Sequence, residues 1–517
     1  MRMSTRDSLN RKEAEAGIPT AARLDDSASD WVSNQLARCV LTFDSPSLEN
    51  SGPPVWDLRR SPGEAGVLFS LGSGEEGAAE AVRTAPPGLI DDLIAFGFLV
   101  PAGRAGGSPG TERVAVEWRG CRLTVNPQTP LRFEITSARS GRPPGTRMHL
   151  LQYGKTALRF LVVGSSAAEP LAEREIRFLK RAGLLVTRAE SKSMDGLFAV
   201  PVDRELLEFL PSAHRAEITR AAAAPGELML NRGLIIQEGD RVPARIAAKI
   251  YDHDWMQRNL PHLWIEDLPG TAVSSYWLDG DRRQLLEDLV AGRILPPELA
   301  FDDLEILCAV QALVPRGYHA RREADWRWML DQAHRDLEAD ECVVFRNMIA
   351  PVQLAMFRRY VRLMVERQYF CHDIQYNTSE RYWVPDDPVT SNVLVQTSQL
   401  LNLVVPDKVQ PGYCLLTSHR HGAELRRHKD QNRMCNYAFS VLIDMIAGPG
   451  QEPWPLYSWT TGGRKVKMQM GLGDGGLFRP LNFHGREGKL DHSSALMLFS
   501  FVPVGYRGFV NGHRFGR

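Results

Sequence analysis

Two histidines and one aspartate in the C-terminal part of the chain constrain its fold more than any other feature. His428 and Asp430 stand two residues apart, and His484 follows at a distance along the chain. Residues i and i+2 of a β-strand leave the same face, so His428 and Asp430 can offer an imidazole nitrogen and a carboxylate oxygen to one ion. His484 would complete that face. The spacing therefore predicts a strand-rich region that holds a metal ion through two histidines and one carboxylate.

The residues around this triad distinguish it from a chance pairing. A chain with 13 His and 62 acidic residues contains His-x-Asp pairs by chance. A second pair, His334 and Asp336, lies in a helical pattern, where residues two apart point away from each other, so it is a poor chelate. After Asp430 come an apolar, aromatic run at residues 437–444, a Gly/Pro turn and another apolar run at residues 494–503. These runs predict successive buried strands.

Four motifs in this region carry a resemblance to a known family. They are Leu425-x-x-His428-x-Asp430, residues 452–456 (Glu-Pro-Trp-Pro-Leu), residues 473–478 (Gly-Asp-Gly-Gly-Leu-Phe) and His484-x-Arg486 before an apolar strand. Together they resemble the Fe(II)/2-oxoglutarate-dependent dioxygenases, particularly the prolyl-hydroxylase-like bacterial members. The resemblance covers residues 341–517 and implies a double-stranded β-helix. It also implies that His428, Asp430 and His484 are the catalytic iron ligands and that Fe(II), 2-oxoglutarate and O2 take part.

The anchor of 2-oxoglutarate departs from the family pattern. Such enzymes usually place an Arg or Lys on the last core strand, where this chain has His-Ser-Ser at residues 492–494, and His419 stands where a Tyr is expected. Arg486 is our first choice of anchor, because Arg can form a bidentate bond to a carboxylate; alternatively, Arg486 faces the substrate. The other candidates for the co-substrate are Lys489, Ser493, Ser494 and Tyr413, and Arg381 is a candidate for an acidic group of the substrate. A degenerate core is the other interpretation.

Composition excludes several classes of function. The 517 residues are 43% hydrophobic and 24% charged, with a formal net charge of zero. This balance gives no general attraction to nucleic acid or anionic lipid. The chain shows no long apolar run and no signal peptide, so we expect a cytoplasmic protein without a membrane partner. Its 7 Cys form no Cys-x-x-Cys pair, which argues against a zinc module or a disulfide framework.

The order of patterns predicts an α+β chain in five segments. Residues 89–100 and 176–186 each read as a helix stopped by a glycine and followed by an apolar strand, which is the ending of a winged-helix unit. Either a duplication or chance explains the similarity of the two segments. Helical periodicity follows, and residues 351–368 predict a long helix that braces the last domain. The predicted segments are a disordered N-terminus (1–30), two winged-helix-like domains (31–120 and 121–240), a helical region (241–340) and the double-stranded β-helix domain (341–517).

The front domains suggest how a substrate is recognised. They weakly resemble the peptide-recognition winged helices attached to enzymes of ribosomal peptide pathways, and they lack the basic stripe that nucleic acid requires. We therefore expect an oxygenase that hydroxylates an amino-acid side chain, free or in a peptide or natural-product precursor. A dimerisation module, giving a homodimer, is the alternative role for these domains. A non-catalytic peptide-binding or scaffold protein with a degenerate β-helix core is the alternative for the whole chain.

Overall fold

The structure is a computed structural model of the chain, and part of the chain is described below. The described residues are 31–33, 38–43, 55–58, 62–73, 77–86, 88–102, 115–126, 131–139, 142–149, 157, 173–182, 184–187, 198–250, 259–266, 268, 272–372, 378–430, 435–448, 450–506, 508–510 and 513–515. The predicted disordered segment 1–30 lies outside them. Among the described residues, no helix combines the length and the apolar character that crossing a membrane requires.

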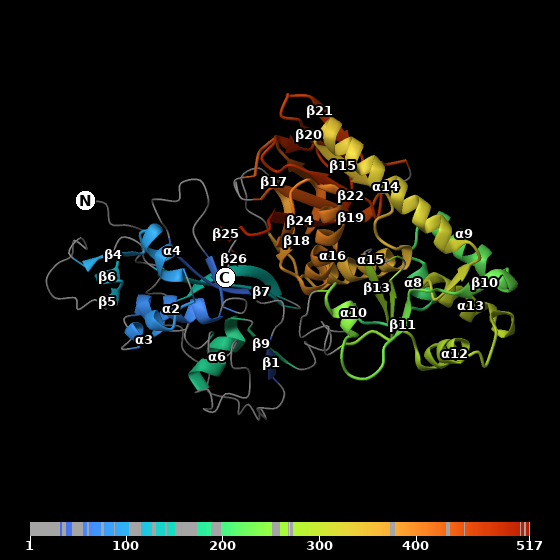
Figure 1. Ribbon diagram of the computed structural model, residues 1–517, viewed down its shortest axis with the longest axis horizontal. Coiled ribbons are helices and arrows are strands. Elements are labelled where there is room, and N and C mark those ends of the chain that lie inside the picture. The colour runs from blue at the N-terminus through green and yellow to red at the C-terminus, as the bar shows by residue number, and fades with distance from the viewer. Residues whose placement is uncertain are drawn as a thin grey trace.

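A seven-stranded antiparallel sheet forms the centre of the C-terminal half (Figure 1). Its order is β15-β22-β19-β24-β18-β17-β16. The strands are β15 (Cys342–Phe345), β16 (Cys371–His372), β17 (Thr378–Pro385), β18 (Val409–Leu425), β19 (Tyr437–Ile446), β22 (Gly475–Phe478) and β24 (Ser493–Pro503). The central strands β19 and β24 are buried along most of their length. The two apolar runs that the sequence marks as strands are therefore confirmed as strands.

A small sheet packs against this large one. It has the order β21-β20-β23 and consists of β20 (Leu456–Trp459), β21 (Lys465–Met468) and β23 (His484–Gly485). Leu456 and Met468 from the small sheet share one buried cluster with Ala438 and Phe478 from the large sheet. Apolar burial between the two sheets thus holds them together. The mixed helix and sheet architecture with antiparallel sheets agrees with the predicted α+β class.

Two helices pack on the seven-stranded sheet: α15 (Pro351–Glu366) against β19 and α16 (Pro388–Val404) against β18. The predicted long helix is thus confirmed in α15, which begins at a proline, a residue suited to the first helical turn. Asp444 of β19 pairs with Arg358 at 2.9 Å and with Arg362 at 2.6 Å, both on α15. These ion pairs to the buried Asp444 carboxylate fix the helix on the sheet.

The segment before this sheet mixes helices and short strands. Its helices are α8 (Arg204–Leu207), α9 (Ser212–Ala222), α10 (Ala244–Ala247), α12 (Gly280–Val290), α13 (Phe301–Ala309) and α14 (Tyr318–Asp340). Its strands are β10 (Leu228–Leu230), β11 (Leu234–Ile236), β12 (Leu263–Glu266), β13 (Val273–Tyr276) and β14 (Leu313–Pro315). The prediction of a helical region at 241–340 is therefore incomplete, because short buried runs carry no decisive periodicity.

One continuous hydrophobic core joins this segment to the seven-stranded sheet. It runs from Phe198 to Phe501 along the sequence. The ring of Phe198 stacks on Phe357 of α15 with centroids 5.6 Å apart and meets Tyr360 edge-on at 5.9 Å. A domain boundary at residue 240 is therefore wrong, because residues 198–240 contribute to the same core as the seven-stranded sheet.

The N-terminal unit, residues 31–187, has a core of its own that runs from Cys39 to Leu185. Its helices are α2 (Pro62–Ser73), α3 (Ala78–Arg83), α4 (Leu89–Ala95) and α6 (Glu173–Ala182). Its sheets are β3-β2-β7-β8, β4-β6-β5 and β1-β9. The strands are β1 (Trp31–Ser33), β2 (Arg38–Phe43), β3 (Val55–Asp57), β4 (Leu99–Pro101), β5 (Ala115–Trp118), β6 (Cys121–Val125), β7 (Leu131–Arg139), β8 (Arg142–His149) and β9 (Leu185–Thr187).

The predicted boundary at residue 120 is also wrong. It falls inside the hairpin between β5 and β6, whose turn holds Arg119 and Gly120 at φ 47° and 77°. The first predicted helix ending is present: α4 stops before Gly97, at φ 72°, and β4 follows. In the second copy, α6 precedes β9, but β9 pairs with β1 rather than with a hairpin of its own. The sheets around the two endings therefore differ, and the winged-helix assignment stays a prediction.

Candidate metal site

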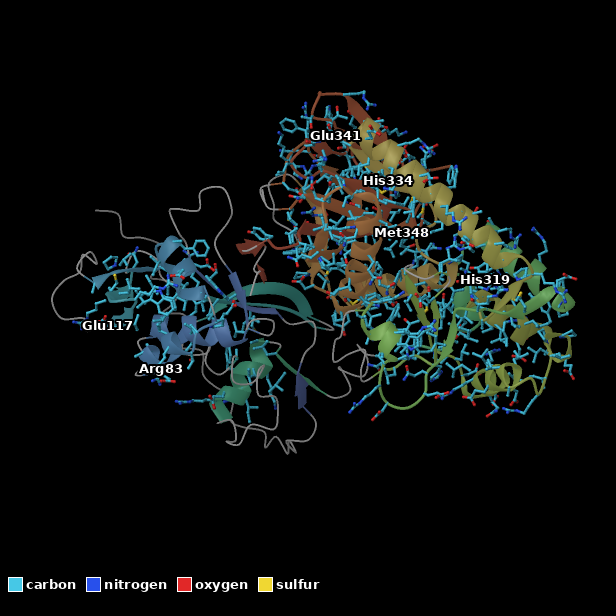
Figure 2. The ribbon with its side chains drawn as sticks, in the orientation of Figure 1. Arg83, Glu117, His319, His334, Glu341 and Met348 are labelled. Carbon is cyan, nitrogen blue, oxygen red and sulfur yellow. The ribbon has the colours of Figure 1, made fainter. Side chains whose placement is uncertain are left out.

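The structure brings the three predicted ligands together. Asp430 Oδ1 lies 3.5 Å from His428 Nε2 and 3.4 Å from His484 Nε2. Among the described residues, His, Cys, Asp and Glu side chains converge in a group of three at this place, with one ligand atom from each within 4.8 Å of the others. The alternative pair fails, because His334 lies on α14 (Figure 2) and Asp336 accepts a hydrogen bond from Gln332 of the same helix at 2.6 Å.

The backbone around the triad differs from the regular strand that the sequence suggests. β18 ends at Leu425, and the chain then crosses from the large sheet to the small one. There His428 forms an isolated antiparallel bridge with His484, through hydrogen bonds of 2.9 Å and 2.8 Å in the two directions. The Asp430 amide donates to the carbonyl of Pro480 at 2.9 Å. The bridge thus places the two ligand-bearing segments directly side by side.

Hydrogen bonds to the backbone orient both imidazoles. His428 Nδ1 lies 2.7 Å from the carbonyl oxygen of Arg426, and His484 Nδ1 lies 3.1 Å from that of Asn482. A carbonyl oxygen only accepts, so each Nδ1 carries the hydrogen. In a neutral imidazole the other nitrogen, Nε2, then presents a lone pair, and such outer contacts orient histidines that bind metals. Both Nε2 atoms face the Asp430 carboxylate.

The charge state of Asp430 fits a cation between these groups. Burial raises the pKa of its carboxyl group, but contacts with His428 and His484 outweigh burial and hold the pKa below its usual range. A carboxylate oxygen and two imidazole lone pairs that face one another repel unless a proton or a metal ion lies among them. Two histidines and one carboxylate form the facial ligand set that leaves further positions open on non-haem Fe(II).

Close packing at Gly485 holds the bridge in place. A Cβ atom there would lie 2.9 Å from Arg427 Cα and 3.0 Å from Arg427 N, so it would collide with the backbone beside His428. Movement of that backbone is resisted, because the Arg427 guanidinium packs 4.6 Å from the Trp459 ring and 4.2 Å from the Phe483 ring. The absence of a side chain at residue 485 is therefore needed for the ligand geometry.

We expect Gly485→Ala to weaken divalent metal binding by about 10- to 100-fold, the range found when groups around a metal site are disturbed. All three ligands remain, so the loss would come from separation of the two segments. The matched control is Gly462→Ala, whose Cβ would meet only Thr460 Oγ1, at 3.8 Å. Titration calorimetry with Ni²⁺ measures the effect. Equal affinities for the two variants would show that the bridge does not set the geometry.

The predicted co-substrate residues divide into two groups. Arg486 is largely enclosed: it donates a hydrogen bond to the Trp454 carbonyl, and burial lowers the pKa of its guanidinium to about 10. Ser494 is buried on the face of β24 that His419 of β18 shares, since the two residues are register partners. Tyr413 lies on that same face of β18, and burial raises the pKa of its hydroxyl above the ordinary value. Tyr413 and Ser494 thus share a face of the sheet with His419, and Arg486 stands two positions after His484.

Two other predicted residues do not point toward this region. The Lys489 side chain is 71% exposed and pairs with Glu424 at 3.2 Å, so its charge is directed to solvent. Ser493 precedes Ser494 on the same strand, and successive residues of a strand project to opposite faces. Both candidates are therefore corrected, because neither faces the interior between the two sheets.

Sequence reasoning gave Arg381 only a loose role and gave His419 none. The structure buries both: the exposed fraction is 7% for Arg381 and 4% for His419. They are register partners on β17 and β18. The alternation of side chains along β18 would have put His419 on the face of Thr417, which is fully buried. That signal was present in the sequence, but its use required the strand to be placed in the sheet.

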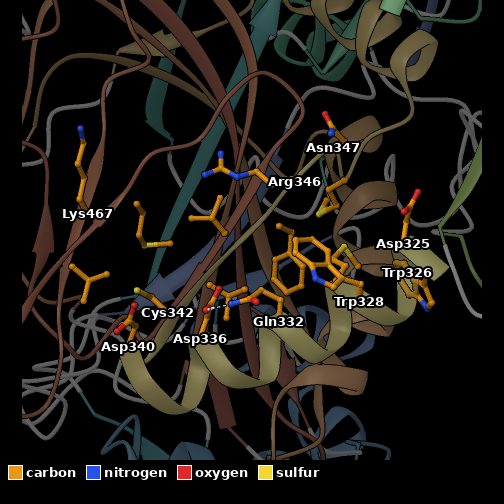
Figure 3. Close-up of a pocket in the computed structure, with 18 of the residues that line it drawn as sticks. Asp325, Trp326, Trp328, Gln332, Asp336, Asp340, Cys342, Arg346, Asn347 and Lys467 are labelled. Carbon is orange, nitrogen blue, oxygen red and sulfur yellow. Dashed lines mark hydrogen bonds between the residues drawn. The ribbon is translucent and has the colours of Figure 1, made fainter. Parts of the chain in front are cut away.

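A cavity of about 530 Å³ lies elsewhere, lined by α14 and β15 (Figure 3). Trp328, Gln332 and Asp336 belong to α14, and Cys342 and Arg346 lie on or next to β15. None of the three candidate ligands lines this cavity.

Comparisons with known proteins find similarity to solved structures over about a third of the chain. No protein-family model matches the sequence, and a search of curated proteins finds no match. Among solved structures, a Pseudomonas putida prolyl-4-hydroxylase shares 15% identity over 35% of this chain and 100% of its own, with a TM-score of 0.30. An oxidoreductase of the 2OG-Fe(II) oxygenase family from Burkholderia pseudomallei shares 8% over 36% of this chain and 94% of its own, with a TM-score of 0.28. EctD from S. alaskensis with bound Fe shares 16% identity over 35% of this chain and 78% of its own, with a TM-score of 0.28.

Proposed function

We propose that the protein is a non-haem Fe(II) oxygenase that uses 2-oxoglutarate and O2. The observation that carries the proposal is the convergence of His428 Nε2, His484 Nε2 and Asp430 Oδ1, with both Nδ1 atoms held by backbone carbonyls. Three protein ligands on one side of an iron ion leave positions for a bidentate co-substrate and oxygen. The large and small sheets would form the double-stranded β-helix that frames this site.

The protein groups have separate roles in this proposal. His428, Asp430 and His484 hold the metal, and the backbone bridge fixes the distance between the two histidines. Bound iron would supply the chemistry by which O2 oxidises both 2-oxoglutarate, to succinate and CO2, and an unactivated carbon of the substrate. The buried side chains of Arg381 on β17, His419 on β18 and Ser494 on β24 orient the co-substrate and keep water out. The chain thus contributes binding, orientation and exclusion.

The substrate class is a further part of the proposal. We infer hydroxylation of an amino-acid side chain, presented by a peptide or a natural-product precursor. The N-terminal unit supports a recognition role, because it has a core separate from that of the catalytic part and, in its described residues, no cluster of three metal-binding groups. An extended peptide can bind by adding a strand to a sheet edge. Such a grip raises the local concentration of the peptide at the metal.

Metal content and co-substrate turnover test the proposed activity together. The full-length protein, purified without oxygen and supplied with Fe²⁺, is expected to hold one iron per chain and to release succinate when 2-oxoglutarate and O2 are added. Inductively coupled plasma spectrometry and succinate detection give the two readings. A folded protein that binds no divalent metal would rule out the oxygenase and favour a non-catalytic binding protein.

A further inference from the structure

A row of buried side chains crosses the large sheet beside the metal site. Arg381 on β17 lies opposite His419 on β18, and His419 lies opposite Ser494 on β24. Directly opposed residues of antiparallel strands project to the same face, so these side chains are neighbours. Their exposed fractions are 7%, 4% and 7%. Three polar groups are therefore gathered in one enclosed place.

Two members of this region have buried polar atoms without a protein partner. Neither ring nitrogen of His419 has a hydrogen-bond partner among the described residues, and the same holds for Arg486 Nε. A buried polar atom left without a partner costs about 1–3 kcal/mol. Native structures seldom keep such atoms, and those that remain often face a ligand or water. His419 and Arg486 thus have hydrogen-bonding capacity reserved for something else.

Positive charge surrounds the His419 ring. Burial, and then the charges of Arg381 and Arg486, lower the pKa of His419 well below its ordinary value, so the imidazole is neutral. The Trp454 ring links two of these groups, with its centroid 6.1 Å from the His419 ring and 5.1 Å from the Arg486 guanidinium. Two guanidinium groups are therefore gathered around one neutral imidazole. Buried positive charge of this kind favours an anion.

These side chains lie beside the segments that carry the candidate metal ligands. Arg486 stands two positions after His484, and its backbone amide donates a hydrogen bond of 2.9 Å to the carbonyl of Leu425, where β18 ends. The Arg486 guanidinium reaches the Trp454 ring, and that ring also contacts His419. The backbone that holds His484 is thus connected through Arg486 and Trp454 to His419 and its register partner Arg381.

From this arrangement we propose that Arg381, His419 and Arg486 form the seat for the distal carboxylate of the 2-oxo acid. The inference rests on the proposed oxygenase function and specifies which acid it takes. Arg381 from β17 supplies the cation that is missing from residues 492–494 of the last strand. Its planar group can bind a carboxylate through two parallel hydrogen bonds. His419 donates a third bond, and Arg486 adds charge from the side of the small sheet.

If these residues bind the distal carboxylate, the protein should have different affinities for two acids that share the 2-oxo acid end and differ in that carboxylate. 2-Oxoglutarate carries the distal carboxylate, whereas 2-oxobutyrate lacks it. The test uses full-length protein loaded with Ni²⁺, and titration calorimetry gives the dissociation constant of each acid. We expect Arg381→Met to weaken 2-oxoglutarate binding by about 10- to 150-fold, the effect of losing hydrogen bonds to a charged group. Its affinity for 2-oxobutyrate and for Ni²⁺ should stay at the wild-type values.

Two further variants keep the test decisive. Arg381→Lys retains the charge without the planar fork, so it should show a smaller loss for 2-oxoglutarate and covers the case in which Arg381→Met does not fold. Arg420→Met is the matched control: Arg420 follows His419 on β18, is exposed and stacks 4.1 Å from the Tyr382 ring. This control should bind both acids as the wild type does.

The outcomes separate the seat from the proposed function. Binding of Ni²⁺ and 2-oxobutyrate with unchanged 2-oxoglutarate affinity in both Arg381 variants would overturn the seat and leave the oxygenase standing. Equal affinity of the wild type for the two acids would do the same. Absence of any metal binding by the folded wild type would overturn the function and the seat together. A loss of affinity for 2-oxoglutarate alone in the Arg381 variants supports both the seat and the proposed function.

Discussion

Replacing Asp430 by alanine is expected to lower divalent metal affinity by more than about 100-fold and to abolish succinate release from 2-oxoglutarate. Even groups that only support a metal ligand change affinity by about 10- to 100-fold, and Asp430 would supply one of three ligand atoms directly. The fold should persist, because the Asp430 side chain is 31% exposed and belongs to neither hydrophobic cluster of the two sheets. Metal titration and succinate detection measure the two effects.

Thermal unfolding supplies a control for this prediction. A metal that binds the folded state alone stabilises it by about 2.7 kcal/mol at a concentration 100 times its dissociation constant. Ni²⁺ should therefore raise the melting temperature of the wild type and of Asp407→Ala, an exposed aspartate at the end of the loop before β18. It should leave that of Asp430→Ala nearly unchanged. A normal shift in Asp430→Ala would mean that another group of residues binds the metal.

The convergence of His428, Asp430 and His484 could be predicted from sequence because its signal is largely local. His428 and Asp430 are two residues apart, and the apolar runs of β19 and β24 predict the sheet beside them. Only His484 required a long-range guess, and its place beside a Gly-rich strand made that guess specific. The geometry of the bridge was not predictable in detail, since the sequence suggested a continuous strand through His428.

The buried side chains beside this triad could not be predicted in the same way. The meeting of Arg381 with His419 depends on the register between β17 and β18, and a shift of one residue would turn every side chain to the other face. A bulge between Ser379 and Arg381 changes that register within the same strand. Proximity in sequence to His484 made Lys489 attractive, but its side chain pairs with Glu424 at the surface.

The domain boundaries failed for a related reason. Residues 198–240 resemble the preceding segment in composition, yet their apolar side chains pack on partners more than a hundred positions away. The Arg358 guanidinium on α15 donates a hydrogen bond to the Phe209 carbonyl, and Phe198 stacks on Phe357. Such contacts are set by tertiary packing, which local patterns do not report. The unit that contains the seven-stranded sheet therefore begins before Phe198.

Removing residues 1–240 is expected to prevent folding, whereas removing residues 1–189 is not. The shorter chain loses a set of side chains from the main core, namely Phe198, Val202, Leu206, Leu207, Leu210 and Leu228. Each buried side chain of this size contributes about 1.5–3 kcal/mol. Their joint loss is comparable to the whole stability of a typical domain, about 5–15 kcal/mol. The strand β14 also loses its partner β10.

The two truncations together separate the recognition role from a structural one. Circular dichroism and Ni²⁺ titration should show a folded, metal-binding protein for the chain that begins at residue 190 and an unfolded one for the chain that begins at residue 241. Peptide processing by the chain that begins at residue 190 then tests the role of the N-terminal unit. In the full chain, strand β8 of that unit lies beside β16. Its strand β3 lies beside β26 (His513–Phe515), which pairs with β25 (Gly508–Val510) in a C-terminal hairpin. If that unit binds the peptide, its removal raises the KM for a peptide and leaves uncoupled succinate release unchanged. Equal KM values for both chains would instead assign residues 31–187 to dimerisation or stabilisation.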